Sequence, residues 1–245
     1  MENISTSLRR LHMSGMAMCW KTMTETHQAD KLTFRDGLEI LIQSEMDTRH
    51  HNKIARLIKN AGFRQGASLE ELETSESRGI SAGVISQLAT GEYINQGATV
   101  VISGPTGTGK SFLATALGEN ACRLGYRVKY YTLARLLDEV RLARLEGKEL
   151  KFFERMEHLD LLIIDDFGMK KLEGQQQNDF EQIVDDRYHK KSLILSSQLA
   201  VSDWYSIFSN EMLAEACLDR IVIRLLPRTI SRRTFTSFNS ALTFN

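Results

Sequence analysis

The residues Gly104-Pro105-Thr106-Gly107-Thr108-Gly109-Lys110-Ser111 decide how the second half of this chain folds. They follow an apolar run, residues 99–102, that predicts a buried strand, and they precede a stretch of helical spacing over residues 113–124. The glycines of this G-x-x-x-x-G-K-[ST] pattern let backbone N–H groups turn inward around a phosphate. Strand, glycine-rich turn and helix in this order predict a phosphate-binding loop at the start of a helix.

Two side chains at the end of this loop suit a nucleoside triphosphate and its metal ion. The Lys110 ammonium supplies a point charge to the β- and γ-phosphates, and the Ser111 hydroxyl can ligate Mg²⁺. We therefore predict ATP and Mg²⁺ as the ligands. The predicted nucleotide-binding residues are Gly104, Pro105, Thr106, Gly107, Thr108, Gly109, Lys110 and Ser111.

A second apolar run, residues 161–164, ends in two carboxylates, Asp165 and Asp166. An acid at the end of such a strand holds Mg²⁺ through water in P-loop nucleotidases, and we assign that role to Asp165. Asp166 would then orient or deprotonate the attacking water. The sequence thus predicts an enzyme that hydrolyses ATP.

Apolar runs and amphipathic stretches alternate through the second half of the chain. Further strands are predicted over 127–133 and 193–195, and further helices over 180–188 and 212–226. This alternation predicts an α/β fold with a mostly parallel sheet and helices on both faces.

Residues 1–95 have helical spacing throughout. One helix is predicted from an N-cap at Thr33 to a stop at Gly62, and another over 80–94, with a loop from Gly66 to Gly79 between them. We therefore expect a helical N-terminal domain and linker over residues 1–79, and an ATPase domain over 80–245.

Composition narrows the class of protein. The 245 residues include 31 Lys and Arg and 31 Asp and Glu, so the net charge is zero, and 42% are hydrophobic. This composition is typical of a globular protein, and a neutral chain can meet nucleic acid only through local patches. Three widely spaced cysteines argue against a disulfide framework, and no apolar run is long enough to span a membrane. We expect a cytoplasmic protein.

With the loop and the paired acids in place, the chain resembles the AAA+ ATPases, and among them the IstB family of transposition helpers, which is related to the DnaC helicase loaders. The resemblance covers about residues 5 to 233 and extends into the N-terminal half. The similar stretches are Leu11-His12-Met13-Ser14-Gly15-Met16-Ala17, Thr33-Phe34-Arg35-Asp36, Arg56-Leu57-Ile58-Lys59-Asn60-Ala61-Gly62-Phe63, Asp165-Asp166-Phe167-Gly168, Ser196-Ser197-Gln198-Leu199 with Asp203-Trp204, and Leu218-Asp219-Arg220.

The resemblance implies roles for further residues. Gln198 would sense the γ-phosphate, with Ser197 as the other candidate. Arg220 would be an arginine finger that reaches the nucleotide of a neighbouring subunit, which requires a homo-oligomer; the alternative is an ion pair with Asp219 or Glu215. A sensor II arginine would be Arg232 or Arg233.

The resemblance also implies a function: ATP drives self-assembly on duplex DNA, and the assembly activates a partner transposase. A DnaC-like loader that binds single-stranded DNA and a helicase is the alternative on the same core. AAA+ proteins usually carry Asp-Glu where this chain has Asp165-Asp166. The shorter acid must reach further to the water, so slow hydrolysis is expected, and a nucleotide-dependent scaffold remains a third reading.

Clusters of basic residues are the candidates for DNA contact, although a charge run is more often a solvated helix face. Residues 49–64 carry no acid, and residues 220–245 carry arginines and no acid. The candidates in the first group are Arg49, Lys53, Arg56, Lys59 and Arg64, although a partner protein could use the same face. A further candidate near the middle of the chain is Lys148, Lys151 and Arg155, and the group that follows the second strand is Arg141, Arg144, Lys148 and Lys151.

Overall fold

A computed structural model of the chain describes residues 3–72 and 81–222. It divides into two compact units, Met1–Arg56 and Leu57–Asn245. Within the described ranges, no helix is both long enough and apolar enough to cross a membrane.

The first unit is helical, as the sequence predicts. It contains α1 (Ile4–Arg10), α2 (Ser14–Glu25), a 3-10 turn η1 (Ala29–Lys31) and most of α3 (Phe34–Ala61). Thr33 caps α3, since the Asp36 backbone N–H donates to its hydroxyl at 3.2 Å. Gly62, with φ of 75°, follows the last helical residue, as expected of a C-terminal stop.

A close helix contact at Gly15 holds α2 against α3. A Cβ at Gly15 would lie 2.6 Å from the Ser44 carbonyl oxygen, so only glycine fits without a shift. The Glu45 carboxylate accepts the N–H groups of Gly15 at 2.8 Å and Met16 at 3.1 Å, at the N-terminus of α2. Hydrogen bonding from Arg49 lowers the pKa of Glu45. The contact therefore combines a steric fit with a charge placed at the positive end of a helix.

The second unit is built on a parallel sheet. Its strands are β1 (Thr99–Ser103), β2 (Val128–Thr132), β3 (Leu161–Phe167) and β4 (Ser192–Ser197), in the order β1-β4-β3-β2. All of their pairings are parallel. This confirms the predicted α/β class, and all carboxyl ends of these strands meet at one edge of the sheet.

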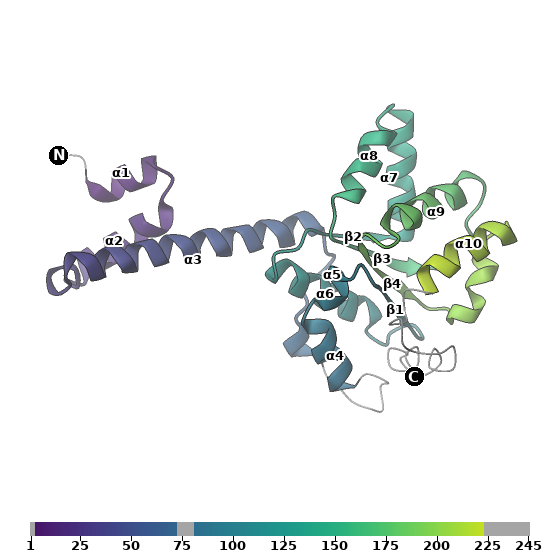
Figure 1. The fold of residues 1–245 in the computed structure, drawn as a ribbon, viewed down its shortest axis with the longest axis horizontal. Coiled ribbons are helices and arrows are strands. Elements are labelled where there is room, and N and C mark those ends of the chain that lie inside the picture. The colour runs from purple at the N-terminus through teal and green to yellow at the C-terminus, as the bar shows by residue number, and fades with distance from the viewer. Residues whose placement is uncertain (1–2, 73–80, 223–245) are drawn as a thin grey trace. The chain divides into compact units, whose positions relative to one another are not determined.

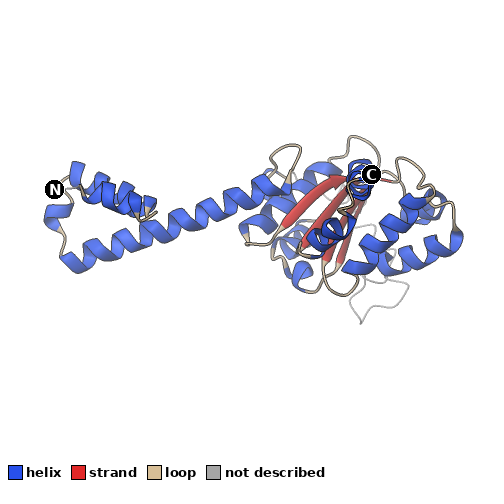
Figure 2. Ribbon diagram, turned by 90° about the horizontal axis from the view of Figure 1, so that it is seen from above, coloured by secondary structure: helices blue, strands red, loops and turns tan. Residues whose placement is uncertain are grey.

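Helices cover both faces of this sheet (Figures 1 and 2), which explains why its strands are apolar on both sides. One face packs against α6 (Lys110–Arg123), α4 (Ala82–Ala89) and α5 (Glu92–Asn95). The other face packs against α7 (Leu133–Leu145), α8 (Glu149–Glu157), α9 (Gln175–Arg187), η4 (Val201–Ile207) and α10 (Glu211–Val222). Successive β3 residues alternate between the two cores: Ile163 lies in the first and Ile164 in the second.

Three predicted helices differ in extent from the structure. The helix expected over 180–188 begins earlier, at Gln175. The helix expected over 80–94 is two helices, α4 and α5, because Gly91 between them adopts a left-handed φ of 75° and ends the first. The helix expected over 212–226 is described as α10 up to Val222, and the rest of it lies outside the described residues.

Buried hydrogen bonds connect neighbouring elements at the amino edge of the sheet, where the strands begin. Arg187 is only 3% exposed, and its guanidinium donates to the carbonyls of Ser192 at 2.6 Å, Met156 at 2.9 Å and Leu159 at 3.3 Å. Burial lowers the pKa of Arg187, with a smaller opposing effect from Asp160. One side chain thus joins α9, the end of α8 and the start of β4.

Candidate nucleotide-hydrolysis site

The phosphate-binding loop runs from the end of β1 to the first turn of α6. Gly107 and Gly109 have left-handed φ values of 82° and 91°, and a Cβ at either would meet nothing within 4 Å. Glycine is therefore favoured there by backbone conformation and not by crowding. Gly109 is the N-cap of α6, so the N–H groups of the first helical turn open toward the loop.

Lys110 lies at the base of this loop. It is 8% exposed, and its Nζ donates to the Pro105 carbonyl at 2.6 Å. Burial lowers the pKa of Lys110, while Asp165 and Asp166 act in the opposite direction. To reach a phosphate, the ammonium exchanges one backbone carbonyl for phosphate oxygens, which is a favourable exchange of a neutral acceptor for a charged one.

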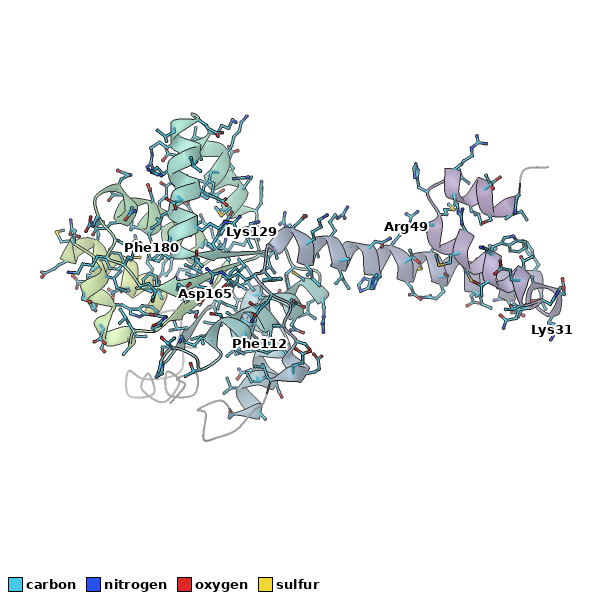
Figure 3. All side chains as sticks on the ribbon, turned by 180° about the vertical axis from the view of Figure 1, so that it is seen from behind. Lys31, Arg49, Phe112, Lys129, Asp165 and Phe180 are labelled. Carbon is cyan, nitrogen blue, oxygen red and sulfur yellow. The ribbon has the colours of Figure 1, made fainter. Side chains whose placement is uncertain are left out.

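Asp165 lies near the carboxyl end of β3 and is 1% exposed (Figure 3). The Tyr130 hydroxyl on β2 donates to its Oδ2, and the Asp166 backbone N–H donates to its Oδ1 at 2.9 Å. Burial opposes ionisation, but hydrogen bonds from Tyr130, Ser111, Ser196 and the Asp166 backbone together outweigh it, so the pKa of Asp165 is lowered. The carboxylate is therefore held in its charged form.

The donors at this point fit Mg²⁺. A carboxylate and a hydroxyl, Asp165 and Ser111, are the hard oxygen ligands that Mg²⁺ prefers, and phosphates and waters usually complete its shell. Among the described residues, no group of three or more His, Cys, Asp and Glu side chains could hold a metal ion. This arrangement suits an ion carried in with the nucleotide, rather than one held in an all-protein cage.

Asp166 lies at an irregularity in the sheet. The pairing of β3 with β4 shifts between Ile164 and Phe167, and Asp166 has a left-handed φ of 59°. Aspartate tolerates this conformation better than most residues. Its side chain is 38% exposed, and its Oδ2 lies 3.6 Å from Nη1 of Arg64. The bulge turns this second carboxylate away from the strand, beside the phosphate-binding loop.

Ser197 and Gln198, the two candidates at the end of β4, have different surroundings. Ser197 is fully buried, and its hydroxyl donates to the Phe167 carbonyl at 2.7 Å. Gln198 instead accepts a hydrogen bond from the Thr106 hydroxyl of the phosphate-binding loop at 2.7 Å. The geometry therefore favours Gln198 as the polar group that responds to the loop.

Most of these residues line one open pocket with a volume of about 360 Å³, within the usual range of small-molecule sites, roughly 300–1,000 Å³. Gln65 also lines it, and the sequence offered no signal for that residue. Gly104, Pro105 and Thr108 are not among the lining residues. The lining consists of Gln65, Thr106, Gly107, Gly109, Lys110, Ser111, Phe112, Asp165, Asp166, Ser196, Ser197 and Gln198.

Arg220 does not line this pocket. It lies on α10, where its Nε is 2.8 Å from Asp185 and its Nη1 is 3.5 Å from Glu181, both on α9. The ion pair exists, but with these acids rather than with Asp219 or Glu215. Arg232 and Arg233, the candidates for sensor II, lie outside the described residues.

Both groups of basic side chains are neutralised in part. After β2, Arg144 pairs with Asp179 at 2.6 Å and with Glu149, and Arg141 and Lys148 also have acidic partners. Among the described residues, Lys151 and Arg155 of this group are exposed with no ion pair. On α3, Arg49 pairs with Glu45 at 2.7 Å. Of the described basic residues in the 49–64 group, three are exposed with no ion pair: Lys53, Arg56 and Lys59.

Comparison with known proteins identifies the family. The model of the IstB-like ATP-binding proteins matches residues 6–226. An insertion-sequence ATP-binding protein of Sinorhizobium fredii is 34% identical over 215 residues, 88% of each chain. The ATP-binding protein of insertion sequence IS1162 from Pseudomonas fluorescens is also 34% identical, over 80% of this chain and 85% of its own.

Solved structures agree on the fold. A DnaC helicase loader has a TM-score of 0.54 and 20% identity, covering 64% of this chain and 93% of its own. DnaA of Aquifex aeolicus, bound to AMPPCP, has a TM-score of 0.54 and 23% identity, covering 63% and 49%. At these identities the likeness concerns the AAA+ fold alone. By the family match and the curated relatives, the chain belongs to the IstB-like ATP-binding proteins.

Proposed function

We propose that this protein is an ATP-hydrolysing helper of insertion-sequence transposition, which assembles on duplex DNA and activates a partner transposase in the cytoplasm. The observation that carries the proposal is the pocket in which the phosphate-binding loop, Asp165, Asp166 and Gln198 converge. The relatives, which are ATP-binding proteins of insertion sequences, support the biological setting.

Each residue of the pocket has a separate role in hydrolysis. Lys110 binds the β- and γ-phosphates, and Ser111 and Asp165 hold Mg²⁺, Asp165 through water. When bound, Mg²⁺ supplies charge neutralisation at the phosphates. Asp166 orients the attacking water, and Gln198 contacts the γ-phosphate and transmits its presence to the loop through Thr106.

Arg220 acts on the nucleotide of a neighbouring subunit. Arg220 does not line the pocket of its own chain, which is consistent with a role in trans, and its ion pairs with Asp185 and Glu181 must then exchange for the phosphate. A well-placed arginine finger is worth roughly 10³–10⁵ in rate. ATP turnover would therefore depend on assembly.

DNA contact is assigned to the exposed cations of α3: Lys53, Arg56 and Lys59. Among the described residues these three cations have no acidic partner, so they can neutralise phosphates without first breaking an ion pair. Each such contact releases counterions, and binding to duplex DNA should weaken steeply as salt rises.

The test uses two variants that complement each other. Arg220→Ala should bind ATP but lose hydrolysis stimulated by duplex DNA, and Lys110→Ala should lose ATP binding. A mixture should recover part of the activity, because Lys110→Ala lends its arginine to the intact pocket of Arg220→Ala. Light scattering should show ATP-dependent assembly of the wild type on duplex DNA.

Two outcomes would change this proposal. No recovery in the mixture, with activity strictly linear in protein concentration, would leave Arg220 as a structural ion pair. Tighter binding to single-stranded than to duplex DNA would favour the helicase-loader function instead.

A further inference from the structure

Arg64 is a charged side chain at the hydrolysis site that the proposed mechanism does not use. Its Nη1 lies 3.6 Å from Oδ2 of Asp166, and its neighbour Gln65 lines the nucleotide pocket. Arg64 follows the end of α3, far along the chain from the phosphate-binding loop. Its position therefore depends on how residues 61–72 pack.

Anchors on both sides of Arg64 fix this segment to the sheet unit. The Phe63 ring packs edge-on against Tyr130, with centroids 6.2 Å apart, and it also covers Gly118, where an added Cβ would be 2.7 Å from the ring. After Arg64, Ala67 is buried, and its N–H donates to Glu119 at 3.0 Å. The arginine is thus presented from an ordered turn, not from a loose end.

The same segment contacts Asp166 directly and reaches Asp165 only through Tyr130. Phe63 packs on Tyr130, whose hydroxyl donates to Asp165, while Arg64 faces Asp166. The Arg64 contact is made to one carboxylate oxygen, between side chains that are 60% and 38% exposed. Such an exposed pair is weak and screened by salt, so it can form and break readily.

We propose that Arg64 is a positioning residue of the hydrolysis site, which holds Oδ2 of Asp166 and restrains this carboxylate from orienting the attacking water. The turnover of ATP is then set partly by the segment that follows α3. This inference rests on the proposed role of Asp166. Because the pair is weak, the restraint slows turnover without abolishing it.

Hydrolysis by Arg64→Ala, measured without DNA, tests the restraint. We expect kcat to rise about two- to fivefold, the range an exposed ion pair can supply, with KM and nucleotide affinity unchanged. Arg64→Gln, which keeps most of the side chain, should behave alike, and Arg64→Lys should stay near the wild type. Added salt should raise the wild-type rate and narrow its difference from Arg64→Ala.

A matched control distinguishes the loss of the Arg64 restraint on Asp166 from a general loosening of residues 61–72. Arg123 on α6 pairs at 3.7 Å with Glu70 of η2 (Leu69–Glu71). Glu70 belongs to the same segment as Arg64, but this ion pair does not involve Asp166. Arg123→Ala should leave kcat unchanged. An equal rise in Arg123→Ala, or a fall of kcat in both Arg64→Ala and Arg64→Gln, would overturn the proposal.

The Asp166→Asn background decides whether Arg64 acts through Asp166. Single-turnover hydrolysis can follow the slow residual rate there, and Arg64→Ala should then have no further effect. A similar rise in that background would overturn the inference. If Asp166→Asn alone keeps the wild-type rate, the role of Asp166 fails and the inference with it. If Asp166→Asn is slow but Arg64→Ala is silent, only the inference fails.

Discussion

The two edges of the parallel sheet hold their charged side chains in different ways. At the amino edge, Arg187 is almost fully buried and donates to three backbone carbonyls. At the carboxyl edge, Lys110 has one carbonyl partner and Arg64 makes one exposed ion pair. Contacts of the first kind hold the helices to the sheet, whereas those of the second kind can be exchanged for a phosphate or a water.

The largest effect is expected from Arg187→Met, which keeps volume but removes every donor. It leaves the carbonyls of Met156, Leu159 and Ser192 without this partner. The Met156 carbonyl still accepts the Leu159 N–H, and each buried group left unsatisfied costs about 1–3 kcal/mol. We expect a loss of about 3 kcal/mol, or a Tm lower by about 6–12 °C, by calorimetry.

The control for this variant is Arg123→Met, since Arg123 is an exposed arginine whose ion pairs are long. Surface changes of this kind usually stay within about 0.5 kcal/mol. If both variants lose the same stability, the amino edge is no more tightly held than the protein surface, and the comparison between the edges breaks.

A smaller change in stability is expected from Lys110→Ala, which should lose the stabilisation that Mg-ATP gives to the wild type. A nucleotide that binds only the folded state adds about 2.7 kcal/mol at a hundredfold excess over Kd. The wild type should therefore melt at a higher temperature with Mg-ATP, and Lys110→Ala should show no such shift. Lys191→Ala, which removes a lysine paired with Asp160 at the amino edge, should keep the full shift. Equal shifts in all three proteins would contradict the assignment of the loop.

The smallest effect concerns Tyr130→Phe and depends on pH. The pKa of Asp165 is lowered in the folded protein, so its charged form stabilises the fold above the ordinary Asp range, and this contribution is lost as pH falls through the lowered pKa. Removing the Tyr130 hydroxyl raises the pKa of Asp165. We expect a deficit of about 1 kcal/mol at neutral pH, which shrinks as acid protonates Asp165.

Urea unfolding at neutral pH and below pH 4 measures this deficit. Tyr126→Phe is the control, because the Tyr126 hydroxyl donates to Asn95 at 2.7 Å and that amide does not titrate. Its deficit should be independent of pH. A deficit of Tyr130→Phe that is equally constant would mean that Asp165 is ionised without help from Tyr130.

The site residues that could be predicted from the sequence are those whose place in the fold is determined by a short sequence motif. A strand, a glycine turn and a helix place Lys110 whatever the rest of the chain does. A buried strand that ends in two acids likewise places Asp165 and Asp166 at the same sheet edge, because parallel strands share that edge. Gln198 was reached through resemblance, and its contact with Thr106 gives it a physical basis.

The parts that escaped prediction depend on contacts between distant segments. Tyr130 looks like an ordinary strand residue, and nothing local shows that its hydroxyl meets Asp165. The run of cations over residues 49–64 predicts DNA contact for Arg64, although the partner of Arg64 in the structure is Asp166. Arg144 was placed in a basic patch, but Asp179 and Glu149 neutralise it. A count of basic residues along the sequence cannot show which acidic residues pair with them in the folded protein.

The left-handed backbone at Asp166 offers an account of the shorter acid at a position where the resemblance to AAA+ ATPases implies glutamate. A residue with φ of 59° keeps its backbone at a cost of about 1–2 kcal/mol unless it is Gly, Asn or Asp. Glutamate would extend the reach to the water but would strain the bulge. The reach of the acid and the backbone strain at position 166 are therefore coupled. During sequence divergence, a substitution that lengthens the acid must be accompanied by one that removes the left-handed conformation.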